Sequence, residues 1–328
     1  MFRFLAGRIL TSLISVFGAT LAIFILVHVN PKDPREIFVP QSGYGLTQES
    51  WNRLGDRLGF DKPAPVQYVE WLGRVFRLDF GVSLGLQIDV WDIIKGRLGA
   101  TVQLGIGGWL IAVLMGIPTG VVAAVWRGGI FDYLARFVAL VGQAAPAFVT
   151  GIVMIWLFSV NLNAISDDSP FAFLRIFAMP AGGRTPDELR WKEYVLPCLA
   201  LGWGSAAGLM RLTRSSMLEI LDSEFVKMAR AKGVGNTTVI FKHALRNALI
   251  APITSMLLLF AGFLNGALVV EIVFSWPGIG QVALQEAVQN NDFPLLLGTV
   301  IIFLMYFLVF ATLADILYTV IDPRVRLR

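Results

Sequence analysis

Residues 9–29 read ILTSLISVFGATLAIFILVHV, a run of 21 residues without one charged side chain. As a helix rising ~1.5 Å per residue, this run is about 31 Å long, which matches the hydrocarbon core of a bilayer. Arg3 and Arg8 precede it, as they would in a secretory signal peptide, but no small-residue cleavage pattern follows. The run therefore predicts an uncleaved transmembrane helix.

Further apolar runs predict that the chain crosses the membrane about six times. Of its 328 residues, 56% are hydrophobic and only 15% are charged, which is too apolar for an ordinary soluble domain. Four more runs are long enough to span a bilayer, and a fifth is shorter and rich in glycine: 100–126, 134–160, 248–275, 295–320 and, as the short one, 194–210. The predicted fold class is an all-α integral membrane protein.

The distribution of Lys and Arg predicts how these spans are oriented. Six spans place four segments on the same side of the membrane as both termini: 1–8, 127–133, 211–247 and 321–328. With Arg136 included, that side carries 14 Lys or Arg, whereas the opposite short loops 161–194 and 276–294 carry four and none. Because short loops rich in Lys and Arg stay in the cytoplasm, both termini are predicted to be cytoplasmic.

The predicted spans divide the chain into three regions. These are an N-terminal transmembrane helix at 1–29, an external domain at 30–99 and a five-helix core at 100–328. The external segment carries nine Lys or Arg, which a long translocated loop tolerates. Within it, residues 49–58 and 66–76 alternate apolar and polar positions at helical spacing. They predict short amphipathic helices lying on the membrane surface.

Several classes of function are excluded by what the chain lacks. Its single cysteine, Cys198, allows neither an internal disulfide nor a cysteine-based metal site. The two histidines, His28 and His243, do not stand at a metal-ligand spacing, and no catalytic motif is present. The net charge of +4 comes from scattered residues and forms no basic face. We therefore expect no metal site, no enzymatic centre and no nucleic-acid partner.

The polar segment 211–247 predicts a helix, a turn and a second helix facing the cytoplasm. Gly233 begins the sequence GVGNT, which is typical of a helix stop followed by a new helix start. Before it, an apolar residue recurs every three or four positions: Met217, Leu221, Phe225 and Met228. This pattern fits an amphipathic helix on the bilayer and a rigid element moved by a soluble motor equally well.

Two stretches of this segment resemble a known signature. EFVKMARAKG at 224–233 and FKHALRN at 241–247 closely resemble the cytoplasmic loop of ABC importer permeases of the dipeptide and oligopeptide class. The loop departs from the general family at 227–229, where KMA replaces Glu-Ala-Ala, and in a proline placed at Pro252. Shorter matches run along nearly the whole chain: FGVSL at 80–84, RLGAT at 97–101, GIPTG at 116–120, PAGG at 180–183, RLTRSSM at 211–217, EIVFSWPGIG at 271–280 and DPR at 322–324.

The resemblance implies a type I ABC importer permease of the bacterial inner membrane. A second homologous permease would complete the translocation pathway, two cytoplasmic ABC ATPases would drive it, and an extracytoplasmic binding protein would deliver di- or oligopeptides. The chain lacks the phosphate-binding motif G-x-x-x-x-G-K-[ST]. This subunit would therefore bind no cofactor and hydrolyse no ATP itself, and ATP and Mg²⁺ would be bound by the partner ATPases.

Two alternatives for the function stay open at this point. Permeases for nickel and for oligosaccharides closely resemble those for peptides, so the cargo is not decided by the resemblance. A second alternative, from another class, is an ion-coupled carrier or channel that needs no ATPase. The presence or absence of ATPase subunits and a measurement of uptake distinguish these possibilities.

The resemblance also implies two sites. Residues expected to couple the permease to the ATPase lie in the cytoplasmic segment: Glu224, Lys227, Ala229, Arg230, Ala231, Lys232, Gly233, His243 and Arg246. Residues expected at an outer gate lie at the external end of the fifth predicted span and directly after it: Glu271, Phe274, Trp276 and Pro277. From the residues alone, a structural pairing explains the carboxylate of Glu271 as well as a gate does. An anchor in the membrane interface likewise explains Trp276.

Overall fold

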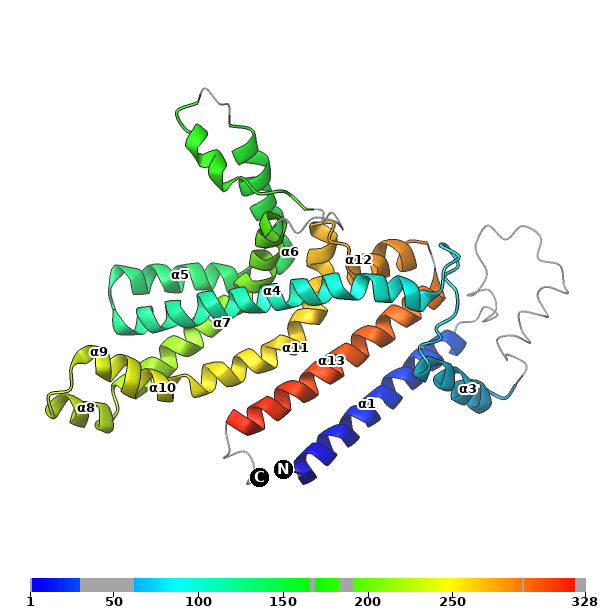
Figure 1. Ribbon diagram of the computed structural model, residues 1–328, viewed down its shortest axis with the longest axis horizontal. Coiled ribbons are helices and arrows are strands. Elements are labelled where there is room, and N and C mark those ends of the chain that lie inside the picture. Colours follow the sequence, from blue (N-terminus) through cyan, green and yellow to red (C-terminus); the bar gives the residue numbers. More distant parts are fainter. Residues whose placement is uncertain (1, 30–61, 166–168, 183–190, 291, 322–328) are drawn as a thin grey trace. The chain divides into compact units, whose positions relative to one another are not determined.

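Every regular element that the computed structural model describes is a helix (Figure 1). The described residues are 2–29, 62–165, 169–182, 191–290 and 292–321. An isolated antiparallel bridge joins Val82 and Asp89. The predicted all-α fold class is confirmed for these residues. The amphipathic helix predicted at 49–58 lies outside them, as do the motif residues 322–324.

The chain divides into two compact units. The first contains residues 1–100 and 277–309, and the second contains residues 101–276 and 310–328. Two long helices, α4 (Val90–Val125) and α13 (Phe293–Ile321), contribute residues to both units. The three regions predicted from the sequence are consecutive stretches of the chain, whereas each compact unit combines stretches that are distant in sequence. The division into three regions stays a prediction.

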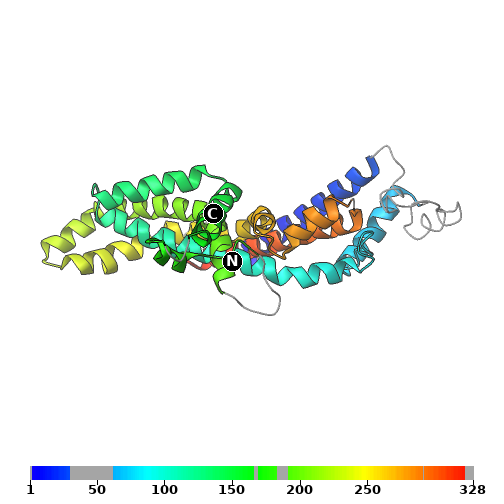
Figure 2. The same cartoon turned by 90° about the horizontal axis from the view of Figure 1, so that it is seen from above.

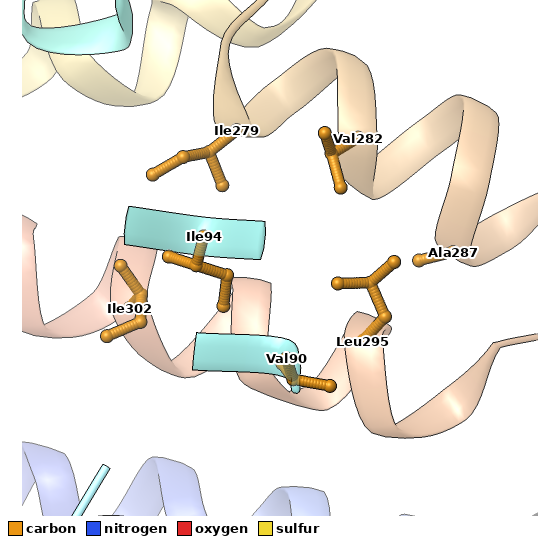
Figure 3. Packing of buried hydrophobic residues seen from close by; sticks show 7 residues of the cluster. All are labelled: Val90, Ile94, Ile279, Val282, Ala287, Leu295 and Ile302. Carbon is orange, nitrogen blue, oxygen red and sulfur yellow. The ribbon is translucent and has the colours of Figure 1, made fainter. Parts of the chain in front are cut away.

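The first unit is built around the beginnings of α4 and α13. Beside these it contains α1 (Phe2–Val29), α3 (Ala64–Phe76), α12 (Ile279–Gln281) and the π-helical segment η5 (Val282–Val288). Side chains from α4, α12, η5 and α13 converge in one apolar cluster (Figure 3) made of Val90, Ile94, Ile279, Val282, Ala287, Leu295 and Ile302. At Gly298 an added Cβ would lie 2.6 Å from Val90, so α4 and α13 pack closely there.

Helix α3 confirms the helix predicted over 66–76. It packs on α1, where the Tyr68 hydroxyl lies 3.0 Å from Oγ1 of Thr20 and the Tyr68 ring meets the edge of Phe24. Leu72 and Val75 are buried on the same side of α3. The location of α3 on the membrane surface stays a prediction.

The second unit is organised around α7 (Trp191–Leu221). The other elements of this unit, apart from the ends of α4 and α13, are α5 (Ile130–Ala144), α6 (Ala147–Met154), η2 (Ile155–Asn161), η3 (Ala172–Phe177), α8 (Glu224–Ala231), α9 (Asn236–Thr238), η4 (Val239–Ala244), α10 (Leu245–Ala248) and α11 (Ile250–Val273). Helix α7 contacts α5, α6, α10 and α11. In both views α8 and α9 lie beyond the end of α7 (Figure 1 and Figure 2).

The described helices account for three to five membrane spans. Three are long and apolar enough to cross a bilayer: Val90–Val125, Trp191–Leu221 and Phe293–Ala314. Two bent helix pairs raise the number to five if each pair is one span. The predicted total of about six stays a prediction. The run at 194–210, which is short in the sequence, belongs to the much longer helix α7.

The predicted continuous span over 134–160 is broken. Helices α5 and α6 meet at an angle of 111° around Ala145 and Pro146. A proline disfavours helical geometry in the residue before it, and Ala145 is accordingly extended, with φ −85° and ψ 124°. Pro146 then precedes the first residue of α6 and so begins a new helix direction.

Close backbone contact joins α4 to α7. A Cβ added at Gly120 in α4 would lie 2.6 Å from the carbonyl oxygen of Met210, and one added at Gly202 in α7 would lie 2.5 Å from that of Gly108. Both contacts are with backbone atoms, which cannot turn away as a flexible side chain can. Small residues permit this close approach of two helices, and Gly202 belongs to the short glycine-rich run predicted at 194–210.

We predict that Gly202→Ala destabilises the permease, because the added methyl group forces the backbones of α4 and α7 apart. Overpacking of this kind costs about 1–3 kcal/mol. Gly208→Ala in the same helix is the matched control, since a Cβ there meets nothing within 4 Å. Thermal unfolding of the purified protein in detergent measures the difference. Equal midpoints for the two variants would contradict the packing described here.

Candidate coupling and outer-gate sites

A break separates the end of α7 from α8. Helix α7 ends at Leu221, and Ser223 adopts an extended backbone with ψ 152° before α8 begins at Glu224. The Ser223 hydroxyl donates a hydrogen bond to the carbonyl oxygen of Ile220, one of the last carbonyls of α7. Serine competes in this way with the helical backbone, which favours a helix end.

The break makes the predicted apolar stripe wrong. In one continuous helix Met217, Phe225 and Met228 would share a face, but an extended residue between them changes the direction of α8. Met217 and Val226 are fully buried, whereas Phe225 is 43% exposed and Met228 is 58% exposed. The side of α8 that packs inward is thus the side of Val226, and two large apolar side chains point outward.

The helix stop predicted at Gly233 is confirmed. Gly233 has φ +79°, a conformation that glycine adopts without a steric penalty. Its N–H donates to the carbonyl oxygen of Arg230 at 2.9 Å, and the N–H of Val234 donates to that of Ala229 at 3.2 Å. These two bonds form a Schellman motif, which satisfies the last carbonyls of α8.

The segment after the turn packs back against α8 and α7. Helix α9 starts directly after Gly235, and η4 follows it and contacts α8. Val226 of α8 and Val239 of η4 are both fully buried. We call residues 224–244 the α8–η4 hairpin. Its base belongs to an apolar cluster with α4, α7 and α10: Val121, Ala124, Met217, Ile240, Ala244 and Ala248.

Most residues predicted to couple to an ATPase lie on the surface of this hairpin. Ala229 and His243 are half-buried, and Arg246 is exposed in α10 just after the hairpin. The exposed members within the hairpin are Glu224, Lys227, Arg230, Ala231, Lys232 and Gly233. Sequence reasoning missed the outward-facing Phe225, Met228 and Phe241, the last of which is 60% exposed. The serine at 223 is the signal that would have placed Phe225 and Met228 outside the core.

The charged side chains of the hairpin make few contacts that hold them in place. Lys227 forms an ion pair with Glu224 at 2.8 Å, and both side chains are largely exposed. Among the described residues, no three His, Cys, Asp or Glu side chains are grouped to hold a metal ion. The surface of the hairpin thus combines apolar and cationic side chains, which suits contact with another protein.

The predicted outer-gate residues lie at the end of α11, in a tightly packed corner. Phe274 is buried, and two glycines allow its close packing: a Cβ at Gly151 would lie 2.9 Å from the Phe274 ring, and one at Gly182 would lie 2.0 Å from the Phe274 carbonyl oxygen. The next residue, Ser275, has φ +49°, so the chain turns sharply here. Glu271, one turn earlier, is fully buried.

Trp276 is fully buried. Its ring packs edge-on against Tyr194, with 4.8 Å between the ring centroids, and the Tyr194 hydroxyl donates a hydrogen bond to Oε1 of Gln103 at 3.2 Å. A tryptophan that anchors a protein in the membrane interface would be exposed at the surface, which Trp276 is not. Pro277 follows and is half-buried.

Comparisons with known proteins give the family. Residues 116–327 match the family model "Binding-protein-dependent transport system inner membrane component", and residues 1–105 match the model of its N-terminal part. The chain belongs to this family of inner-membrane transport components. Permeases of the family are transport subunits, and this chain is an integral inner-membrane protein that works with other subunits.

Named relatives match this permease over its whole length. The dipeptide transport system permease protein DppB of Escherichia coli K12 is 36% identical over 339 residues, with 99% of each chain covered. The glutathione transport system permease protein GsiC of the same strain is 33% identical over 326 residues, again with 99% of each chain covered. The predicted membership of the dipeptide and oligopeptide class of ABC importer permeases is confirmed.

Two solved structures share the fold of the permease. A chain of the inward-facing MetNI methionine ABC transporter superposes with a TM-score of 0.54 at 15% identity, covering 70% of this chain and 96% of that chain. A chain of an amino acid ABC transporter superposes with a TM-score of 0.51 at 16% identity, covering 69% and 93%. Because both identities are low, these likenesses show the fold alone. That fold is the ABC importer permease fold.

We predict that Gly182→Ala loosens the corner around Phe274, because the added Cβ cannot coexist with the Phe274 carbonyl oxygen at 2.0 Å. Hydrogen exchange of residues 273–277, followed by mass spectrometry, is expected to accelerate at least about tenfold, since 1.4 kcal/mol of local destabilisation already gives that factor. Ala181→Ser at the exposed neighbouring position is the control and should exchange like the unmodified chain. Similar exchange in all three proteins would argue against this contact.

Proposed function

We propose that this permease is one of two similar membrane subunits of an ATP-driven importer of di- or oligopeptides. We infer the cargo from the full-length relationship to two permeases whose names specify dipeptide and glutathione transport. A second homologous permease forms the other half of the pathway. An extracytoplasmic binding protein delivers the peptide, and two cytoplasmic ABC ATPases supply the energy.

In this proposal the α8–η4 hairpin is the contact with an ATPase subunit. Its outward-facing Phe225, Met228 and Phe241 offer apolar area, and exposed Arg230 and Lys232 beside them carry charge. Apolar anchors surrounded by polar residues are typical of protein interfaces. The buried Val226 and the base of the hairpin join it to α4 and α7. A force applied to the hairpin is thereby passed to the helices of the membrane domain.

ATP and Mg²⁺ belong to the partner ATPases in this assembly. The permease sequence contains no G-x-x-x-x-G-K-[ST] motif, which ATPases use to surround the phosphates of ATP. Both termini and the hairpin face the cytoplasm, in agreement with the 14 Lys or Arg on that side of the predicted topology.

We further propose that the corner formed by Glu271, Phe274, Trp276 and Pro277 holds the outer end of the pathway. The support is its packing: Phe274 and Trp276 are enclosed and leave little freedom for the end of α11. Glu271 is buried in the same turn of the helix, where a carboxylate requires a polar or charged environment. Movement of α11 would therefore move this corner as one piece.

Purification of the permease from its native membrane tests the assembly. We expect a second permease and two ATP-binding subunits to co-purify, and the reconstituted complex with its binding protein to import a labelled dipeptide only when ATP is supplied. Nickel ions and oligosaccharides serve as competing cargoes. Uptake of either one in place of peptide would contradict the proposed cargo. Uptake driven by an ion gradient without ATPase subunits would contradict the whole proposal.

A pair of substitutions tests the hairpin. Gly233→Val places a β-branched residue at φ +79°, which the hairpin cannot hold without distortion, whereas Gly235→Val places it at φ −60°. Neither Cβ meets any atom within 4 Å, so the two variants differ in backbone strain. Peptide uptake per assembled complex should fall about tenfold or more for Gly233→Val, as expected from about 1–2 kcal/mol of strain. Normal uptake by Gly233→Val would contradict the role of the hairpin.

A further inference from the structure

An ion pair between a buried carboxylate and a mostly buried arginine fixes the end of α7 to the start of α5. Asp132 lies in the first turn of α5 and is completely buried. Arg214 of α7 donates two hydrogen bonds to it, from Nε to Oδ1 at 2.7 Å and from Nη2 to Oδ2 at 2.9 Å. The backbone N–H of Gly128 also donates to Oδ2 at 2.9 Å, and Arg136 lies 3.3 Å from Oδ1. The carboxylate is thus held from three directions.

The pair stands at the place where α7 leads into the α8–η4 hairpin. Arg214 precedes the end of α7 at Leu221 by about two helical turns, and α8 begins directly beyond the break. Through Gly128, the carboxylate also holds the turn between α4 and α5. Three elements, α5, the α4–α5 turn and α7, therefore meet at one side chain.

Further along the same helices, α5 and α7 approach each other closely at Gly142. A Cβ at Gly142 of α5 would lie 2.1 Å from Nε1 of Trp203 in α7. These contacts lie at Gly142 and at the glycines between α4 and α7, whereas the ion pair acts nearer the end of α7 and opposes rotation of that end. A bidentate Arg–carboxylate contact has a defined geometry, which an apolar contact does not impose.

We infer that Asp132 and Arg214 are positioning residues for energy coupling. They hold the end of α7 in one orientation relative to α5, so that a displacement of the α8–η4 hairpin moves α4, α5 and α7 together. Without the pair, the same displacement turns the end of α7 alone, and ATP is hydrolysed without transport. This inference rests on the proposed function of the hairpin.

A neighbouring ion pair provides a matched control. Arg127, in the α4–α5 turn, lies 3.4 Å from Asp222, directly after the end of α7. Their side chains are 63% and 73% exposed, so the pair is solvated. Exposed pairs of this kind contribute little to holding two elements together. Asp222→Asn removes a charge at the same end of the helices without breaking the buried contact.

The experiment compares variants of the complete complex, reconstituted with its ATPases and binding protein. For each variant the amount of assembled complex, the rate of ATP hydrolysis and the peptide imported per ATP are measured. Arg214→Lys and Asp132→Asn are expected to lower the peptide imported per ATP at least fivefold, with hydrolysis per complex changed by less than about twofold. Asp222→Asn should leave all three quantities within about twofold of the unmodified complex.

A double variant separates positioning from stability. Well-packed apolar residues often replace a buried ion pair without loss of stability. Asp132→Leu with Arg214→Met is therefore expected to restore the amount of assembled complex but not the peptide imported per ATP. If the double variant restores both quantities, or if the single variants import normally, the inference is wrong. An unmodified complex that imports no peptide with ATP would instead contradict the proposed function itself.

Discussion

Direct backbone contact between α4 and α7 is the constraint on which the second unit depends. At Gly120 and Gly202 a carbonyl oxygen of the facing helix lies within 2.6 Å of the position where any other residue would carry its Cβ. Helices that approach this closely gain dispersion contacts along their whole length, which matters in a bilayer because lipid supplies no hydrophobic force between helices. The contact also removes the freedom of one helix to slide along the other.

The α8–η4 hairpin is attached to the closely packed helices α4 and α7. Its inner side is anchored by Val226, Val239 and the apolar cluster with Met217, whereas its outer side exposes Phe225 and Met228. Exposed apolar side chains opposite a buried side are unfavourable in water, and they are typical of a surface that another protein covers in an assembly. The Schellman motif at Gly233 keeps its tip in one conformation. The hairpin thus has the fixed conformation and the buried attachment that its proposed role in coupling requires.

Several features of the fold could be predicted from the sequence. The apolar runs predicted helices at 100–126, 194–210 and 295–320, because the length and composition of a span are local properties. Gly233 was predicted to end a helix for the same reason. The break at Pro146 and the extended Ser223 are also local signals, yet each was outweighed by a longer apolar pattern that continued across it. The actual direction of each helix after its break then depended on what it packs against.

The sequence by itself determined that this chain is a membrane permease of the binding-protein-dependent class, because hydropathy and short motifs are read residue by residue along the chain. Only the tertiary structure decided that Asp132 meets Arg214, 82 positions away, and that Trp276 is enclosed and not at the surface. It also decided which side of α8 is exposed. Each of these facts depends on which helix faces meet, and that is set by the packing of distant segments and not by the pattern of any one of them.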